Sequence, residues 1–212
     1  LLDAIEQLQG LPLPVSSLER DILPARLDVY RPGDLDELCA AGEVVWRGFG
    51  SLGAGDGRIT LYLTDHFSML APPAELLDDE AARQIVELLA EKGALFFDGL
   101  QAALGGFRND LLDVLWDLVW AGQVTNDTLR PLRSLLRGTK PERRRERRTD
   151  RVFRSRRTLQ LPGSEGRWSL LADTETPEPT PTERQTALAA ELIERDGVLT
   201  RERVSGEGMA DG

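Results

Sequence analysis

The sequence predicts an α+β protein built from tandem winged-helix modules, each a three-helix bundle followed by a β-hairpin wing. Two internal repeats predict this class. The motif Leu-x-x-Leu-x-x-Ala-Gly-x-Val occurs at residues 35–44 and again at 115–124, and it has the form of a helix end, a glycine and a strand. ELLAEKGAL at 87–95 and ELIERDGVL at 191–199 repeat another helix, glycine stop and short strand. We therefore expect two modules and the beginning of a third.

The first module is expected over residues 1–70. Apolar residues at helical spacing predict three helices, and serine N-caps, a proline and two glycines mark their ends. Two stretches of alternating apolar and polar residues then flank a turn with the pair Asp56-Gly57, which is typical of a β-hairpin. The expected elements are helices at 1–9, 16–24 and 32–42 and hairpin strands at 43–52 and 58–63.

A second module is expected over residues 71–136. Asp78 or Asp79 is placed to cap its first helix, which ends at Gly93. A short strand, two helices and a further strand come next, and the last helix ends at Gly122. The remaining segments are an arginine-rich linker at 137–157, a strand segment at 158–172, a linker rich in proline and acids at 173–182, and the truncated start of a third winged helix at 183–212. A small β-barrel element that includes the strand segment is an open alternative.

Charge is distributed unevenly along this acidic chain, whose formal net charge is −10. Residues 133–157 hold twelve basic and three acidic residues, a net charge of +9, so the remainder carries −19. A block of arginines attracts a polyanion, whereas an acidic body does not. We expect this block to bind single-stranded nucleic acid, with a solvated loop as the alternative. The candidate nucleic-acid-binding residues are Arg143, Arg144, Arg145, Arg147, Arg148, Arg151 and Arg154.

The third helix of each expected module is acidic. In many winged-helix proteins this helix enters the major groove with basic and polar side chains leading, and carboxylates there would repel phosphates. Packing is therefore the favoured role. Trp116 and Trp120, on a helix that is apolar nearly all round, predict burial on two sides, between modules. Arg47 and Arg58 of the first wing are weaker candidates for contact with phosphate groups. The carboxylates are Asp34, Asp36 and Glu37 on one helix and Asp110, Asp113 and Asp117 on the other.

Catalytic and metal-binding signals are weak. The sequence has no phosphate loop, nucleophile elbow or H-E-x-x-H motif. The glycine-rich stretch at 48–57 lies between two expected strands, where a hairpin turn is the better interpretation. His66 follows Asp65 but lacks the nucleophile or metal partner that a general base needs. With one histidine and one cysteine, neither a zinc site nor an intrachain disulfide is expected, and Cys39 is predicted to be buried.

The composition is typical of a globular protein, with 41% apolar and 29% charged residues. No apolar run approaches the roughly 18 residues of a membrane span, and no signal peptide is recognisable. With a single cysteine, these features predict a cytoplasmic protein without a membrane partner. The first residue, Leu1, and an unfinished helical pattern at the other end predict a piece of a longer protein.

Several stretches taken together resemble one family. They are LPARLDVYRPGDLDELCAAGEVVWRGFGSLGAGDGRITLYL, GALFFDGL, LWDLVWAGQVTNDTLRPLRSLL, GRWSLL and TERQTALAAELIERDGVLTRE. In combination they are similar to the region of bacterial large helicase-related proteins (Lhr) that lies C-terminal to the helicase core. The likeness covers most of residues 12–204 and is much more specific than any single stretch.

The resemblance implies a parent protein that is an ATP-dependent superfamily 2 helicase, moves along single-stranded DNA and is linked to DNA repair. It implies tandem winged helices with a β-barrel module, similar to winged-helix DNA glycosylases. ATP and Mg would be bound by the parent's helicase core, whose motifs are missing from this chain, so no cofactor and no catalytic residue is expected here. The implied partners are DNA, single-stranded or as an RNA–DNA hybrid, and other Lhr modules.

The sequence therefore predicts a non-catalytic accessory segment of a DNA-repair helicase that organises neighbouring modules and binds single-stranded nucleic acid. Three alternatives stay open. The chain could be a protein–protein or self-assembly scaffold that forms a homo-oligomer, or part of a winged-helix DNA glycosylase-like module. It could also be a winged-helix transcription regulator, although the acidic third helices argue against that role.

Overall fold

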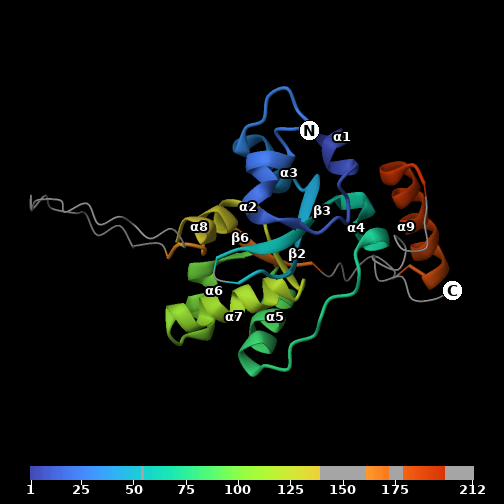
Figure 1. Ribbon diagram of the computed structural model, residues 1–212. Helices are drawn as coiled ribbons and strands as arrows, with labels where there is room; N and C mark the ends of the chain where they lie inside the picture. The colour runs from blue at the N-terminus through green and yellow to red at the C-terminus, as the bar shows by residue number, and fades with distance from the viewer. Residues whose placement is uncertain (54, 139–160, 172–178, 199–212) are drawn as a thin grey trace, which may run out of the picture.

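The computed structural model describes residues 1–53, 55–138, 161–171 and 179–198. Helices and two small antiparallel sheets make up these residues, so the predicted α+β class is confirmed (Figure 1). The predicted linker at 137–157 lies outside the described residues except for 137 and 138, and so does most of the arginine block. Of the predicted linker at 173–182, residues 179–182 are described, and a helix already begins at Pro181.

The first half of the chain forms α1 (Leu2–Glu6), β1 (Leu13–Pro14), α2 (Val15–Ser17), the π-helical turn η1 (Leu18–Ile22), α3 (Pro32–Ala41), β2 (Val44–Ser51), β3 (Gly57–Leu63) and α4 (Thr64–Leu70). Its three strands form an antiparallel sheet in the order β1-β3-β2. The predicted hairpin is confirmed, but the first helix is shorter than expected and the second divides into α2 and η1. α4 was not predicted, and it is held by Phe67 and Leu70, which pack beside Tyr62.

The second half forms α5 (Glu80–Lys92), β4 (Leu95–Phe96), α6 (Phe97–Leu104), α7 (Arg108–Trp120), β5 (Val124–Asn126), α8 (Arg130–Gly138), β6 (Arg167–Leu170) and α9 (Pro181–Asp196). Its strands form a second antiparallel sheet in the order β4-β6-β5. In Figure 1, α1 and α3 lie above the strands, α5 to α7 lie below them, and α9 lies to one side.

The position of β6 corrects one predicted boundary. Residues 158–172 were expected to lie outside the second module, but β6 is the central strand of its sheet. Trp168 pairs with Leu95 on one side and with Asn126 on the other. A local pattern cannot show this pairing, because the partners are separated by most of the module. The sheet has three strands and is open, so the described residues give no support to a β-barrel there.

The repeated motif ends α3 and α7 with the same cap. Gly42 and Gly122 have φ values of 77° and 73°, in the left-handed region that glycine adopts without strain. In both copies the residue after the glycine donates its N–H to a carbonyl five positions earlier, Leu38 or Leu118. This bonding satisfies carbonyls that the helix end leaves free. The prediction that the motif is a structural helix stop is confirmed.

One buried apolar cluster spans both sheets. It contains Leu35 and Trp46 from the first half and Trp168 from the second. The Thr125 hydroxyl donates a 2.6 Å hydrogen bond to the Trp46 carbonyl, and the Trp46 indole donates to the Thr128 carbonyl at 3.3 Å. The two halves therefore share a continuous core along the edge of β2.

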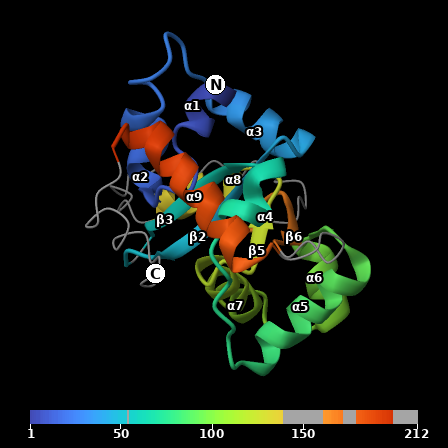
Figure 2. The ribbon, with the colours of Figure 1, turned by 90° about the vertical axis from the view of Figure 1, so that its right-hand side faces the viewer.

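α9 lies against α4, beside the first sheet (Figure 2). A capping box between Thr180 and Glu183 starts this helix. Leu188 packs near Tyr62, and Gly197 ends the helix with φ of 71°. This is the helix and glycine stop that the sequence predicted for a third module. The remainder of that predicted module, from residue 199 onward, lies outside the described residues.

Candidate nucleic-acid interface

The seven candidate arginines lie between α8 and β6, outside the described residues. The structure does define where this segment leaves and rejoins the body. α8 ends at Gly138, and the described chain resumes at Leu161, before β6. In the sequence, the arginine block therefore lies between β5 and β6, two neighbouring strands of one sheet.

α8 begins directly after a turn made by Asn126. The Asn126 carboxamide oxygen accepts from the backbone N–H and the hydroxyl of Thr128, at 3.1 and 3.2 Å. Its side-chain amide donates to the Glu165 carbonyl at 2.9 Å, which ties the turn to the segment before β6. Asparagine favours such turns because its side chain can replace backbone partners. Leu132, on the inner face of α8, is fully buried in the apolar cluster.

Arg133 joins α8 to the first half of the chain through four hydrogen bonds. Its guanidinium donates to both Glu19 oxygens at 2.7 and 2.8 Å, and to an Asp36 oxygen at 2.7 Å. It also donates to the Pro32 carbonyl at 3.0 Å. Burial alone would lower the pKa of Arg133, but its hydrogen bonds to Glu19 and Asp36 outweigh burial and raise it. The cation is therefore permanently charged and already neutralised.

The carboxylates around Arg133 have further partners. Tyr30 donates its hydroxyl to Glu19 at 2.6 Å, and burial together with this bond raises the pKa of Tyr30. The second Asp36 oxygen accepts the Leu129 backbone N–H at 2.8 Å. Asp36 is thus turned inward on α3 and serves as an anchor for α8. Asp34 and Glu37, by contrast, remain exposed on α3.

α7 is buried on two sides, as the sequence predicted. The Trp116 and Trp120 rings stack with centroids 5.3 Å apart, and Trp116 meets Trp168 edge-on at 5.8 Å. On its other side, α7 touches the first hairpin. A Cβ at Gly48 would collide with the Val119 backbone, and one at Gly57 would collide with the Trp120 ring. The helix is therefore a packing unit between the two sheets.

The two wing arginines occupy different environments. Arg47 is buried, and its guanidinium donates to the Pro73 carbonyl at 3.1 Å beside Gly122. Burial lowers the pKa of Arg47. In this position Arg47 cannot reach a phosphate, so its prediction as a minor candidate is wrong. Arg58 on β3 is exposed and stays a candidate.

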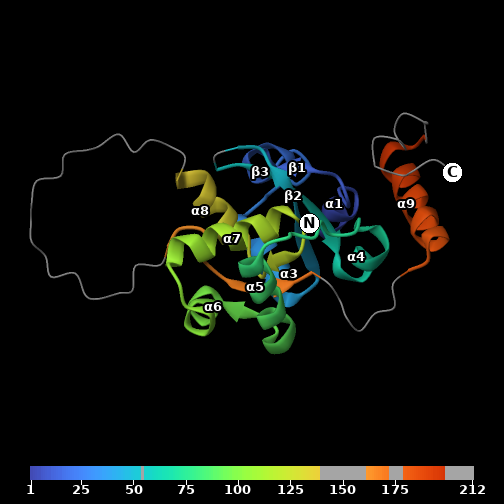
Figure 3. The ribbon, with the colours of Figure 1, turned by 90° about the horizontal axis from the view of Figure 1, so that it is seen from below.

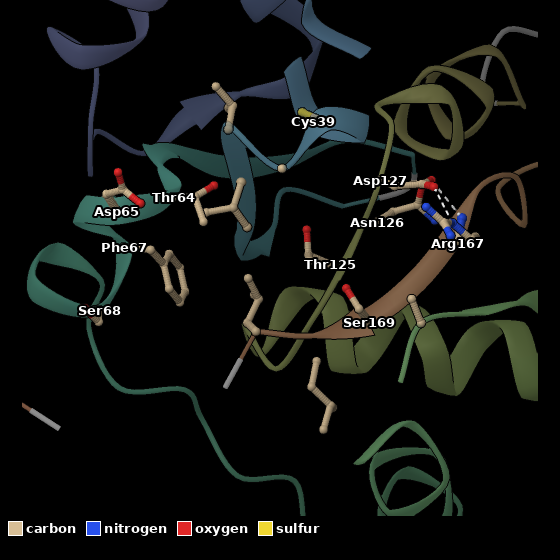
Figure 4. A pocket seen from close by; sticks show the side chains of 16 residues that line it. Cys39, Thr64, Asp65, Phe67, Ser68, Thr125, Asn126, Asp127, Arg167 and Ser169 are labelled. Atoms are coloured by element: carbon tan, nitrogen blue, oxygen red, sulfur yellow. Dashed lines mark hydrogen bonds and ion pairs between the residues drawn. The ribbon is translucent and has the colours of Figure 1, made fainter. Parts of the chain in front are cut away.

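A cavity of about 640 Å³ lies between the two halves (Figure 4). Phe67 and Ser68 of α4 lie on one side of it, and Thr125 and Ser169 come from the second sheet. At the rim, Arg167 donates to Asp127 at 2.9 Å and Asp65 adds a further carboxylate; these residues do not give the positive excess that a phosphate requires.

Cys39 lines the same cavity but is a poor nucleophile. Burial, and after it the negative charge of Asp36, raises the pKa of Cys39 to about 12, so the thiol stays protonated at neutral pH. His66 lies elsewhere: its Nδ1 accepts from the buried Gln9 amide at 3.1 Å. Among the described residues no group of His, Cys, Asp and Glu could hold a metal ion.

Sequence reasoning missed two features that organise this region. The Glu19–Arg133–Asp36 network joins residues about a hundred positions apart, and no spacing rule connects them. The contact of Gly48 with α7 was also missed. The glycine-rich stretch was interpreted only as a turn, yet a glycine inside a strand often marks the close approach of another backbone.

The helices, the glycine cap and the following hairpin are typical of the winged-helix class, and residues 1–64 match the family model for the winged-helix domain of large helicase-related protein. The whole chain is 39% identical over 226 residues to "Lhr helicase/ probable uracil glycosylase" of Mycolicibacterium smegmatis. It is 36% identical over 234 residues to "Lhr helicase/uracil glycosylase" of Escherichia coli K12. The chain is a relative of the large helicase-related proteins, as its motifs predicted.

The chain spans 15% of the length of each of these two relatives. Their names therefore describe proteins much longer than this chain. Within the residues that the structure describes, no helix combines the length and apolar character needed to cross a membrane.

Proposed function

We propose that this chain is a non-catalytic accessory segment of an ATP-dependent DNA-repair helicase, in which two winged-helix units in tandem hold an arginine-rich segment against single-stranded nucleic acid. One observation carries the proposal. The helices that would read a DNA groove are used for packing: Asp36 of α3 anchors Arg133, and α7 is buried between the sheets. In this proposal the folded part of the chain positions neighbouring modules, and the arginine-rich segment supplies the positive charge that binds phosphates.

The tandem arrangement is supported by matching sheet topology. In both sheets the third strand in sequence lies between the first and the second, as β1-β3-β2 and β4-β6-β5. In both halves a capped helix with the repeated motif precedes the second strand. The second unit then carries α8 and the arginine segment as an insertion between its last two strands.

In this proposal ATP and Mg bind the helicase core of the parent protein, and DNA reaches the chain as a single strand or as an RNA–DNA hybrid. The cytoplasm is the proposed location. The isolated chain is expected to hydrolyse no ATP. Measurable ATP turnover by the purified chain would overturn the non-catalytic part of the proposal.

The binding part is tested by measuring single-stranded DNA affinity across a salt series. Each phosphate contact on a single strand contributes about 0.7 to the slope of log affinity against log salt. Losing five contacts should therefore lower the slope by up to about 3.5. The test variant changes Arg143, Arg144, Arg145, Arg147 and Arg148 to Ala.

A charge-matched control removes five cations from the described body. It changes Arg20, Arg26, Arg31, Arg83 and Lys92 to Ala. The control should keep the wild-type salt slope, because its net charge equals that of the test variant and only the location differs. Equal slopes for the test variant and the wild type would overturn binding by the arginine segment. A stable oligomer with no nucleic-acid binding would instead favour a self-assembly scaffold.

A second candidate function comes from the names of the two relatives, which both include a uracil glycosylase. Applied to this chain, it would make the chain part of a glycosylase-like module. Release of uracil from DNA by the isolated chain would establish that function and replace the accessory role. No release, together with salt-dependent binding, would leave the accessory role in place.

A further inference from the structure

The hairpin of the first sheet carries an exposed aromatic ring that no buried cluster uses. Phe49 lies on β2 and is 43% exposed, outside both apolar cores. Leu52, three residues further, is 44% exposed. Most large apolar side chains of this sheet are buried, including Trp46 and Tyr62. An exposed ring at the end of an otherwise buried strand therefore needs an explanation other than packing.

A β-bulge displaces this ring from the regular sheet. Gly48 pairs with Ile59 and Ser51 pairs with Gly57, so Phe49 and Gly50 together oppose Arg58. Gly50 has φ of 99°, a conformation that glycine allows. Bulges change the direction of side chains and are over-represented at functional sites. The bulge thus sets an aromatic ring opposite an arginine across two neighbouring strands.

The contacts of two glycines indicate which face of the hairpin carries Phe49 and Arg58. Gly48 and Gly57 face α7, where a Cβ would collide with Val119 and Trp120. Successive residues of a strand face opposite sides of the sheet, so Phe49 and Arg58 lie on the other side of the hairpin. The contacts of the two glycines with α7 hold this end of the hairpin in place. A site on such a supported element is better ordered than one on a free loop.

The hairpin end carries one cation and one carboxylate, Arg58 and Asp56. The Asp56 carboxylate accepts the backbone N–H groups of Ser16 and Gly57, at 3.2 and 2.9 Å, and is only partly exposed. The guanidinium of Arg58 is exposed. In Figure 1 and Figure 3 the loop between β2 and β3 lies on the same side of the molecule as α8, from which the arginine segment departs.

We propose that Phe49 and Arg58 form a contact site for single-stranded nucleic acid, in which the Phe49 ring stacks on a base and Arg58 neutralises the adjacent phosphate. Stacking on aromatic side chains combined with a basic surface is how proteins hold single strands without sequence preference. The site deepens the proposed function and rests on it, because it adds to the arginine segment a second contact that requires bases.

Phe107 provides a matched comparison within the chain. It is more exposed than Phe49, at 80%, but it lies beside a different set of charges. Its neighbour Arg108 is held by Asp98 at 2.7 Å, and Asp110 is exposed nearby on α7. Arg108 is therefore already paired with a carboxylate, so exposure of the ring alone does not make a site.

The test compares Phe49→Ala, Phe49→Tyr and Phe107→Ala in binding to an oligothymidylate and to an abasic strand of the same length. Stacking on one aromatic ring contributes about 1–3 kcal/mol, which corresponds to roughly a fivefold to 150-fold change in affinity. Phe49→Ala should therefore weaken oligothymidylate binding at least about fivefold. It should leave abasic binding and the salt slope unchanged. Phe49→Tyr and Phe107→Ala should bind as the wild type does.

Arg58→Ala should lower the salt slope by about 0.7 on both strands. Equal loss on normal and abasic strands for Phe49→Ala would overturn stacking, as would wild-type affinity of that variant. If the five-arginine variant loses its salt slope while Phe49→Ala has no effect, the site fails and the proposed function stands. If Phe49→Ala weakens binding and the five-arginine variant does not, the Phe49 site is supported and binding by the arginine segment is overturned. No binding by the wild-type chain would overturn both.

Discussion

Arg133 of α8 donates a 2.7 Å hydrogen bond to Asp36 of α3, and 97 positions of sequence separate the two residues. Glu19 holds the same guanidinium from a third element, η1. These contacts fix the helix from which the arginine segment departs. They also pair Asp36, one of the three carboxylates from which α3 was predicted to be an acidic helix.

Replacing Arg133 with Ala should destabilise the chain by about 3 kcal/mol, because Glu19 and Asp36 would be left largely buried without their cation. The free energy of unfolding in urea measures this effect. Arg130→Ala is the control: Arg130 lies 3.9 Å from Asp36 but is 70% exposed, so its loss should change stability by less than about 0.5 kcal/mol. Equal effects of the two changes would show that the network does not stabilise the junction.

Gly48→Ala should disrupt the contact between the first hairpin and α7. The added Cβ would overlap the Val119 carbonyl, and neither backbone can move without disturbing its own element. A loss of at least about 2 kcal/mol in unfolding free energy is expected from such overpacking. Gly33→Ala is a suitable control, because a Cβ there meets no atom within 4 Å. A stable Gly48→Ala chain with an unchanged melting temperature would contradict the packing described for α7.

Cys39 should be almost inert in the folded chain. With its pKa raised to about 12 by burial, the thiolate is scarce at pH 8. Alkylation by iodoacetamide should therefore be slower than in the urea-unfolded chain by about two orders of magnitude or more. The rate of mass gain measures this, with Cys39→Ser as the blank. Similar rates in both states would show that the thiol is open to solvent.

The same thiol makes stability depend on pH in the alkaline range. Below about pH 8.5 the thiol is protonated in both states, and its contribution is fully present. As pH rises toward 12, only the unfolded thiol ionises, so the folded state loses stability. Urea unfolding of the wild type should thus become easier above pH 9, by more than in Cys39→Ser. Parallel pH curves for the two proteins would contradict this.

Docking of α9 should tighten on mild acidification. Burial raises the pKa of Glu191, although nearby Arg195 opposes the shift. A raised pKa means that the folded state favours the protonated carboxyl, so this contribution is present at low pH and is lost as pH rises above the ordinary value of 4.5. Hydrogen exchange of α9 amides, corrected for intrinsic rates, should show greater protection at pH 5 than at pH 7.

Glu191→Gln should remove most of that pH dependence and increase α9 protection at pH 7, because a neutral amide has a smaller cost of burial. Glu87 on α5 is exposed and is not one of the charges that shift the pKa of Glu191, so Glu87→Gln should leave the α9 profile as in the wild type. A pH dependence that survives in Glu191→Gln would contradict its assignment to Glu191.

Much of the fold depends on local signals. The repeated glycine caps at Gly42 and Gly122 could be predicted because a left-handed helix end has a short and specific pattern. The first hairpin was likewise predicted from alternation and turn residues. The central place of β6 in the second sheet could not be predicted, because a strand as short as Arg167–Leu170 gains its place only through partners far away in the sequence.

For the candidate site, too, some features could be predicted from the sequence and others could not. Composition alone identified the arginine block and the acidic body, and the apolar pattern around Trp116 and Trp120 predicted burial on two sides. The exposed pair Phe49 and Arg58 was not recognised as a unit, because a bulge changes which residues oppose each other and leaves no simple mark on the strand pattern.

The sequence by itself determined the class of the protein: helices, caps, the first wing and the likeness to large helicase-related proteins all depend on neighbouring residues. The tertiary structure alone decided how charges and faces are used. Asp36 became an anchor for Arg133, Arg47 was buried, and α7 became a joint between two sheets. The physical reason is that caps and periodicity act over one or two helical turns, whereas ion pairs and close backbone contacts depend on the folded positions of distant segments.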